Sequence, residues 1–539
     1  MADFEQALAL LLLTTGLAVV SRWLPWPRPI TYVLGGIGFA VAHFLPDAAL
    51  DPGFFFLCFL PPLLFADGWL MPLREFAKAK RPIVLLASGL VVFTTLVVGL
   101  VAHWLVPGLP LSMAFALGAV VSPTDAVAVN AITERLKVPV RLTTVLNGES
   151  LMNDATGLVA FKFALAALVA GTFSLRAAAL SFAFIAIGGL ILGFAVSYAV
   201  GRLRDLLRHV HGSDPLIEIT LSLLTPYAAF LAAERLQVSG VLAVVAAGLH
   251  SGWRDPVRTD VQTRQTVWTV WSTVLFWLNG LAFVLLGLQF PRLFAAVNGS
   301  YSLLHLVGLT AAVAGVAALA RIAWFFPAAY LPFVLSARVR ATETRPSWQA
   351  LLVGGWAGLR GAVTLAAALS IPLLLPGGAA FPYRDLVIFL AFGVIVASLL
   401  VQGTTLEWLV CRLGLQEDGL YRKEERVART AAVEAGLAAL RALESATTSP
   451  EHHAALGYVI AEYEQRLSTL GAEGETRTTA RRRRAAEHRY RLAALEAERH
   501  AVDALWRRNV IADEVHRPLQ QLLDHEESML RAQPTNEED

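Results

Sequence analysis

The chain has 539 residues, of which 56% are hydrophobic, and its mean hydropathy is +0.57. Charged residues make up 16%, against roughly 25% in ordinary soluble domains, so the composition argues against a soluble globular protein. The net charge of +2 indicates no particular partner, and the two cysteines, Cys58 and Cys411, give no disulfide framework or metal-ligand spacing.

Apolar runs dominate the first 411 residues. A transmembrane helix needs about 17–25 predominantly apolar residues. Thirteen segments satisfy this requirement: 5–21, 29–45, 53–70, 82–107, 111–133, 144–171, 175–201, 215–234, 237–252, 266–290, 301–328, 348–375 and 384–411. We therefore predict an all-α polytopic membrane protein with about 13 transmembrane helices, in which residues 1–411 form the membrane domain and 412–539 a helical cytoplasmic tail.

Arginine and lysine are concentrated in alternate loops between these segments. One set of loops contains Arg22, Arg28, Arg74, Lys78, Lys80, Arg81, Arg135, Lys137, Arg141, Arg202, Arg204, Arg208, Arg254, Arg258, Arg264, Arg338, Arg340 and Arg345. The opposite set contains little beyond Arg176, Arg235, Arg292 and Arg384. By the positive-inside rule the first set faces the cytoplasm, which places the amino terminus outside and the tail inside.

A polar island, Ser122-Pro123-Thr124-Asp125, lies inside the fifth predicted span. Proline within a helix removes one backbone hydrogen bond and clashes with the preceding turn, so we expect the helix to break there. Broken helices at membrane depth are typical of transporter binding sites. Thr124 and the freed carbonyls are candidate cation ligands. Asp125 either binds the ion or caps the second half-helix, and capping is the favoured interpretation.

A second island, Gly148 to Gly157, opens the sixth span and contains Glu149, Ser150, Asn153 and Asp154. On a helix, residues four apart share a face, so Ser150 and Asp154 lie together with Glu149 and Asn153 on the neighbouring row. An ionisable residue in hydrocarbon marks a functional site by default. Because hard oxygen ligands suit alkali cations and protons, this island predicts a cation site.

A third island, Gly354 to Gly361, places four glycines around Arg360 in the twelfth span. It predicts a second interrupted helix, seven spans after the first, as two inverted repeats would produce. A membrane-buried arginine needs a carboxylate partner, and Glu149 is the candidate for a structural ion pair with Arg360. That pairing leaves Asp154 free to titrate.

Four further charged residues lie in or near the apolar runs. Lys162 and Arg321 are each interpreted as helix–helix or cavity-wall residues. Asp67 and Glu218 either line an ion pathway or lie near the water interface.

The tail is rich in Ala, Glu, Arg and Leu at helical spacing, with separations between helices expected at Thr447–Pro450 and Gly471–Gly474.

The three islands, in this order, resemble the signature of monovalent cation:proton antiporters, in the branch of bacterial NhaP-type proteins and animal sodium/proton exchangers. The resemblance covers residues 1–411 and implies a homodimer with a dimerisation part and a mobile core that moves like an elevator. It also implies that Asp154 carries both cation and proton, with Na⁺ bound at Asp154, Ser150 and Thr124, and with Glu149 near the ion and facing Arg360.

These observations together favour a secondary antiporter of the plasma (bacterial inner) membrane that exchanges Na⁺, K⁺ or Li⁺ for H⁺ in pH and Na⁺ homeostasis. Asn153 stands where the electrogenic branch has a second aspartate, so one-to-one electroneutral exchange is expected. The alternatives are a cation channel, an intramembrane enzyme, or a membrane sensor that signals through its tail. Transported ions and membrane lipid are the expected partners; no cofactor and no nucleic acid are expected.

The orientation can be tested with epitope tags at both ends of the chain. In right-side-out vesicles an external protease should remove the amino-terminal tag and spare the carboxyl-terminal one, because the arginine-rich loops face the cytoplasm. Inside-out vesicles serve as the control and should give the opposite pattern. The reverse assignment would contradict the topology.

Overall fold

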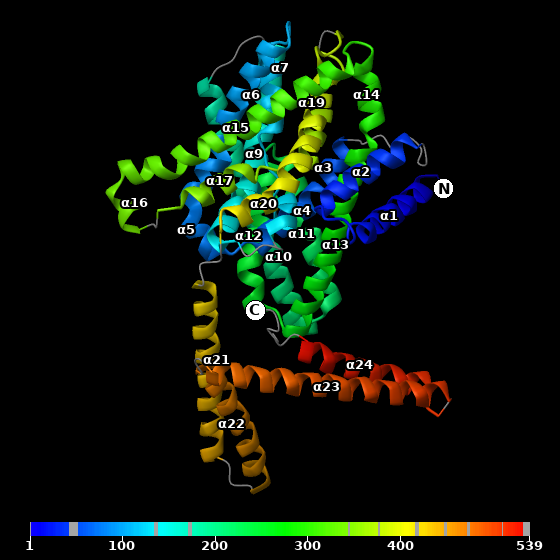
Figure 1. Cartoon of the computed structure of the whole chain (residues 1–539), viewed down its shortest axis with the longest axis vertical. Coiled ribbons are helices and arrows are strands. Elements are labelled where there is room, and N and C mark those ends of the chain that lie inside the picture. The colour runs from blue at the N-terminus through cyan, green and yellow to red at the C-terminus, as the bar shows by residue number, and fades with distance from the viewer. Residues whose placement is uncertain are drawn as a thin grey trace. The chain divides into compact units, whose positions relative to one another are not determined.

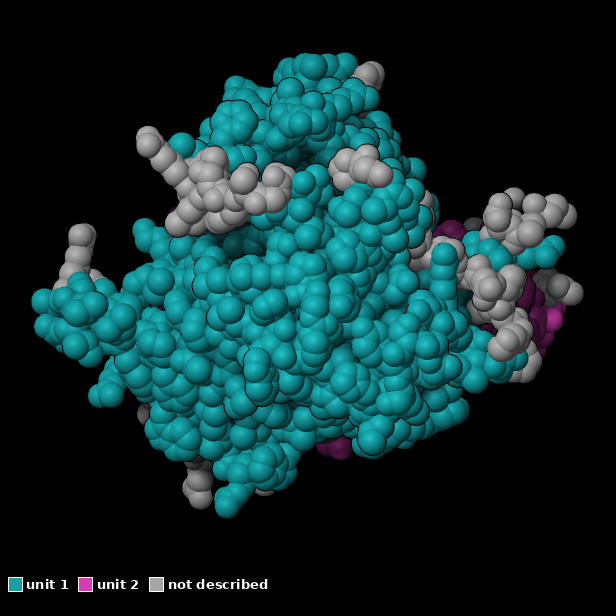
Figure 2. Space-filling view, turned by 90° about the horizontal axis from the view of Figure 1, so that it is seen from above, with its two compact units in different colours: residues 1–417 teal, residues 418–539 magenta. Residues whose placement is uncertain are grey.

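A computed structural model describes residues 2–42, 52–133, 138–170, 175–342, 345–375, 378–415, 420–446, 450–471, 475–508 and 510–531. The chain divides into two compact units, Met1–Glu417 and Asp418–Asp539, which Figure 2 distinguishes by colour. Both units are helical, and the described residues outside the helices form only an isolated β-bridge between Leu374 and Ala380. The all-helical fold predicted from the sequence is confirmed.

Helices fill the membrane unit (Figure 1). They are α1 (Ala2–Val20), α2 (Arg28–Val41), α3 (Pro52–Cys58), α4 (Leu60–Leu70), α5 (Leu73–Val84), the π-helix η1 (Leu85–Leu90), α6 (Val91–Leu105), α7 (Leu111–Val121), α8 (Ala126–Thr133), α9 (Val140–Ala170), α10 (Leu175–His211), α11 (Pro215–Arg235), α12 (Gly240–Arg258), α13 (Val261–Leu288), α14 (Phe290–Asn298), α15 (Leu303–Leu335), α16 (Ala337–Thr342), α17 (Trp348–Trp356), α18 (Ala362–Leu369), α19 (Arg384–Ala397), the π-helix η2 (Ser398–Gln402) and α20 (Gly403–Arg412).

Each of the thirteen predicted spans falls on one or more of these helices, and the turn predicted at Glu234 and Arg235 separates α11 from α12. Among the described residues, eight helical segments are long and apolar enough to cross a membrane: Pro52–Leu70, Leu73–Leu105, Val140–Val169, Leu180–Val210, Pro215–Arg235, Val261–Asn298, Leu303–Leu335 and Arg384–Arg412. The protein therefore spans the membrane several times. The full count of thirteen stays a prediction.

Of the five predicted spans outside these eight segments, two are interrupted helices, and the others fall on α1, α2 and α12. The fifth predicted span is divided into α7 and α8, of 11 and 8 residues, and the twelfth into α17 and α18, of 9 and 8 residues. Each half is too short to cross about 30 Å of hydrocarbon alone. Both interruptions lie where proline or clustered glycines predict them.

Several helices of the membrane unit begin at a side-chain cap. Ser239 accepts the Leu242 N–H at the start of α12, and Ser347 accepts the Ala350 N–H at the start of α17. A cap of this kind satisfies one of the four N–H groups that the first turn of a helix leaves unpaired.

Packing divides the membrane unit into two groups of helices. The first helix group comprises α5 to α9, α15 and α17 to α20, in which α7 packs on α6 and α9 while α15 packs on α6, α17 and α19. The second helix group comprises α1 to α4 and α10 to α13, in which α12 packs on α4, α10 and α11 while α13 packs on α2. The interrupted helices and α9 all belong to the first group.

The second unit contains α21 (Leu420–Ala446), α22 (Pro450–Gly471), α23 (Glu475–Arg507) and α24 (Asp513–Arg531). Helix α21 packs on α22, and α23 on α24. The separations predicted at 447–450 and 471–474 fall largely outside the described residues, with helices ending and beginning on either side.

Candidate ion-binding site

The first interruption places Asp125 at the start of a half-helix. Helix α7 ends at Val121 and α8 begins at Ala126. The Asp125 Oδ1 atom accepts the Val127 N–H at 2.9 Å, so the predicted capping role of Asp125 is confirmed. A Cβ atom at Gly157 of α9 would collide with the Pro123 ring, so glycine there lets the interruption pack directly on α9.

The second interruption, Ala357–Gly361, contacts the first one directly. The Asp125 N–H donates to the Leu359 carbonyl at 2.8 Å. A Cβ atom at Gly361 would overlap the Asp125 carboxylate, so only glycine allows this approach. The Arg360 N–H donates to Ser398 Oγ at 3.2 Å, which anchors the same segment to η2. The two interrupted helices therefore meet at their breaks.

Arg360 is 2% exposed, and its guanidinium bonds backbone rather than a carboxylate. Its Nε–H donates to the Val121 carbonyl at 3.0 Å, and its Nη1 donates to the Gly358 carbonyl. The first of these bonds covers the carboxyl end of α7, where freed carbonyls carry partial negative charge. The predicted ion pair between Glu149 and Arg360 is therefore wrong.

Glu149 pairs with Arg321 of α15, and each residue is 1% exposed. The contact is bidentate: Nη1 donates to Oε1, and Nη2 donates to Oε2 at 2.8 Å. The Arg321 Nε–H also donates to the Gly354 carbonyl at 3.3 Å, near the end of α17, and the guanidinium lies 5.0 Å from the centre of the Phe325 ring. Arg321, interpreted from the sequence as a helix–helix or cavity-wall residue, is the partner of Glu149.

Thr124 connects the interruption to the polar face of α9. Its hydroxyl donates to Glu149 Oε1 at 3.3 Å and accepts from Asn153 Nδ2 at 2.9 Å. The Ser150 hydroxyl donates to the Thr124 carbonyl at 2.7 Å. Glu149 thus accepts from two side chains, and hydrogen bonds from Ser150 and Asn153 tie Thr124 to α9.

A cavity of about 50 Å³ lies beside this network, between the two helix groups. The polar residues that line it are Asp67, Thr124, Asp125, Ser150, Asp154, Asn279 and Thr364. Asp154 is 9% exposed, and no basic side chain among the described residues forms an ion pair with it. Across the cavity, Asp67 of α4 and Asn279 of α13 therefore face the oxygen-bearing residues of α9 and the first interruption, which are Thr124, Asp125, Ser150 and Asp154.

The remaining predicted residues divide between this cavity and other places. Glu149 and Asn153 lie behind Thr124, outside the cavity lining. Lys162 is exposed on α9 and does not line the cavity. Glu218 belongs to a separate arginine network. Asn279 was not predicted, although an amide in the middle of the predicted span 266–290 is the signal that could have identified it.

Comparison with known proteins identifies relatives along most of the chain. The family model described as sodium/hydrogen exchanger, transmembrane, matches residues 8–412. A sodium, potassium, lithium and rubidium/H⁺ antiporter of Bacillus pumilus is 40% identical over 76% of this chain, which spans 61% of that relative's length. The uncharacterized Na⁺/H⁺ exchanger YjcE of Escherichia coli is 36% identical over 98% of this chain and 99% of its own.

A solved structure shares the fold. The sodium proton antiporter MjNhaP1 of Methanocaldococcus jannaschii matches with a TM-score of 0.60 and 17% identity. The match covers 77% of this chain and 99% of the MjNhaP1 chain. The family resemblance inferred from the three islands is confirmed by the family model and the Escherichia coli relative, whereas the solved structure confirms the fold.

The Glu149–Arg321 pair can be tested by a double-mutant cycle. Arg321→Ala should destabilise the protein by about 3–5 kcal/mol, because the Glu149 charge is left buried without a partner. Thermal unfolding in detergent is the measurement, and Glu149→Ala should cost a similar amount. The double variant should lose clearly less free energy of unfolding than the sum of the losses of the two single variants.

Two further variants make this cycle decisive. Lys162→Ala, on the exposed side of α9, should change stability by no more than about 0.5 kcal/mol. Arg360→Ala should couple to Glu149→Ala more weakly than Arg321→Ala does, because Arg360 bonds carbonyl groups instead. If Arg360→Ala couples to Glu149→Ala as strongly as Arg321→Ala does, or more strongly, the pair of Glu149 with Arg360 predicted from the sequence would be supported instead.

Proposed function

The chain belongs to the sodium/hydrogen exchanger family, and we propose that it is a secondary antiporter in which Asp154 alone carries the exchanged cation or proton. The family is one of transporters rather than enzymes, and its members exchange Na⁺, K⁺ or Li⁺ for H⁺. The observation that supports Asp154 is the difference between two nearby carboxylates. Glu149 is neutralised by Arg321, whereas Asp154 faces the cavity without a basic partner among the described residues.

In this proposal Na⁺ binds at Asp154, Ser150 and Thr124. These residues supply the hard oxygen atoms that alkali cations prefer, and all three line the cavity. Asp125 supports the site as the cap of α8, and it lines the same cavity. Asn153 and Glu149 hold Thr124 in place and contribute no ligand.

Competition for one negative charge explains obligatory exchange. A proton and a cation cannot both occupy the Asp154 carboxylate, and the carboxylate without either is too costly to move through hydrocarbon. Transfer across the membrane therefore proceeds only when one of the two ligands is bound. This requirement couples the inward flow of one ion to the outward flow of the other.

We further propose that the first helix group moves against the second during transport. The cavity lies between the groups, with Asp154, Ser150, Thr124 and Asp125 on one and Asp67 and Asn279 on the other. The proposed assembly is a homodimer of thirteen-span chains with two inverted repeats, oriented in the plasma membrane with the amino terminus outside. Residues 1–411 perform exchange, and 412–539 form a regulatory cytoplasmic tail.

Replacement of Asp154 tests the central proposal. Asp154→Asn should abolish ΔpH-driven Na⁺ exchange in proteoliposomes, because an amide neither binds the proton nor offers the cation a negative charge. The variant should still fold, since Asp154 forms no ion pair with any described residue. Unfolding temperature and elution volume on gel filtration check the fold.

A matched aspartate provides the control. Asp385→Asn changes an exposed carboxylate of the same unit, at the start of α19 and outside the cavity, and exchange should be retained. Substantial Na⁺ transport by Asp154→Asn under the same conditions would exclude the single-carrier scheme.

Exchange should be electroneutral, one cation for one proton. Since Glu149 and Arg321 neutralise each other, Asp154 is the only proposed group that changes ligand during the cycle. A second net charge would make transport depend on membrane potential by about 2.3 kcal/mol per 100 mV. Clamping the potential with K⁺ and valinomycin, once K⁺ is shown not to be transported, should leave the rate of Na⁺-driven proton flux unchanged.

A steady current on a solid-supported membrane would contradict this stoichiometry. The second carrier would then be sought at Asp125 or Asp67, because both carboxylates line the same cavity as Asp154.

A further inference from the structure

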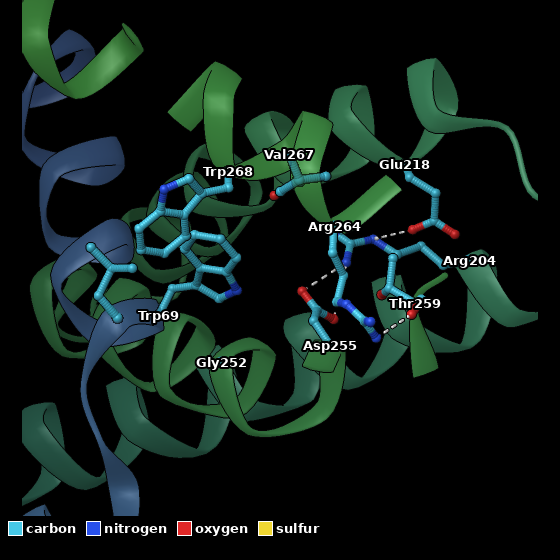
Figure 3. A pocket seen from close by; sticks show the side chains of 11 residues that line it. Trp69, Arg204, Glu218, Gly252, Asp255, Thr259, Arg264, Val267 and Trp268 are labelled. Carbon is cyan, nitrogen blue, oxygen red and sulfur yellow. Dashed lines mark hydrogen bonds and ion pairs between the residues drawn. The ribbon is translucent and has the colours of Figure 1, made fainter. Parts of the chain in front are cut away.

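A second and larger pocket, of about 310 Å³, lies in the second helix group, away from the candidate ion site. It is formed by the ends of α4, α10 and α12 and the first turns of α11 and α13 (Figure 3). Its two ends differ in chemistry: the indoles of Trp69 and Trp268 lie together at one end, and charged side chains gather at the other. We call it the headgroup pocket.

The charged end contains a buried arginine with unused donors. Arg204 is 5% exposed, and its Nη1 donates to Asp255 Oδ2 at 3.2 Å. Its Nε lies 3.7 Å from Glu218 Oε2, beyond hydrogen-bond distance, and neither Nε nor Nη2 has a hydrogen-bond partner. Buried N–H groups without partners are costly, so the site is incomplete without an acceptor.

The carboxylates that line the pocket are already neutralised. Glu218 accepts from Arg208 Nη2 at 2.5 Å, and Asp255 accepts from Arg204. Across the whole ion-pair network four arginines share three carboxylates: Arg204, Arg208, Arg254 and Arg258 with Asp205, Glu218 and Asp255. The network therefore has one positive charge in excess. Arg264 also lines the pocket, and its Nη1 donates to the Thr259 carbonyl at 2.8 Å. The acceptor that fits is an anion.

The apolar end of the pocket is open. Leu70 is 44% exposed and Trp268 is 55% exposed, whereas Arg204 at the other end is buried. The Trp69 and Trp268 rings lie 5.8 Å apart at 43°, so they contact each other and leave no slot for a nucleobase to stack between them. The ligand that matches this shape inserts an anionic head first and leaves an apolar part against the indoles.

We propose that the headgroup pocket binds an anionic phospholipid of the leaflet that faces the arginine-rich loops. The lipid phosphate contacts Arg204 and Arg264, and the first part of the acyl chains packs on Trp69, Trp268 and Leu70. Tryptophan and arginine at the ends of membrane helices are typical of this depth, and anionic lipids are attracted to basic residues at the cytoplasmic surface. A lipid bound here joins α4 to α10–α13 and stabilises the second helix group.

The test measures binding rather than transport. The full-length protein is delipidated in neutral detergent, and its thermal unfolding is followed with added phosphatidylglycerol, phosphatidylcholine or inorganic phosphate. Because a ligand at free concentration L that binds only the folded state stabilises it by RT ln(1 + L/Kd), the tighter-binding phosphatidylglycerol should raise the unfolding temperature more than either other addition at equal concentration. Native mass spectrometry should show the retained lipid.

Two variants remove the proposed contacts without breaking the buried ion pairs of Arg204. Arg264→Gln and Trp268→Ala should each weaken the apparent affinity for phosphatidylglycerol by at least about tenfold. The matched controls are Arg202→Gln, an exposed arginine on α10 that contacts Tyr198, and Trp253→Ala, an exposed tryptophan on α12. Neither control residue lines the pocket, and both variants should retain the parental affinity.

Three outcomes would overturn the proposal. Equal stabilisation by phosphatidylcholine would show that the pocket does not recognise negative charge. Equal stabilisation by inorganic phosphate would identify a site for a free anion rather than a lipid. Loss of affinity that is no greater in Arg264→Gln and Trp268→Ala than in their controls would place the lipid elsewhere.

Discussion

The site depends on two buried guanidinium groups that hold the ends of interrupted helices. A break in a helix at membrane depth frees backbone groups, and hydrocarbon offers them no water. Arg360 donates to the Val121 carbonyl at the end of α7, and Arg321 donates to the Gly354 carbonyl near the end of α17. Arg360, from the second interruption, thereby supports the end of the first half-helix, α7, whereas Arg321, from the continuous helix α15, supports the end of α17. The contact between Asp125 and Leu359 joins the two breaks directly.

This arrangement separates the roles of two carboxylates on one helix. Glu149 and Asp154 are five residues apart on α9, yet they meet different neighbours. Glu149 faces α15 and the first interruption, where Arg321 and Thr124 occupy its oxygens. Asp154 faces the cavity between the helix groups. The buried salt bridge therefore fixes one charge permanently and leaves the other available to a mobile ligand, which is what the proposed exchange requires.

The sequence identified the breaks, the polar island and the Asp125 cap because proline, glycine and helical spacing act locally. It could not choose the partner of Glu149, since arginines at positions 321 and 360 both lie inside apolar runs and no local pattern distinguishes them. Lys162 has a simpler explanation. Eight residues along a helix from Asp154 correspond to a rotation of about 80°, which turns the side chain away from the site. The position of Asn279 at the cavity depends on how α13 packs against the first helix group, and residue spacing along the chain does not determine that packing.

The position of the cavity links the local chemistry to the proposed movement. Asp154, Ser150, Thr124 and the arginines that support them all belong to the first helix group, so that group can move without disturbing its own hydrogen bonds. Asp67 and Asn279 belong to the second group and would separate from the ion as the first group moves. In the proposed movement the fixed charges of Glu149 and Arg321 would travel as a neutral pair. The charge on Asp154 would then decide whether movement is permitted, and either a proton or a cation would cancel it.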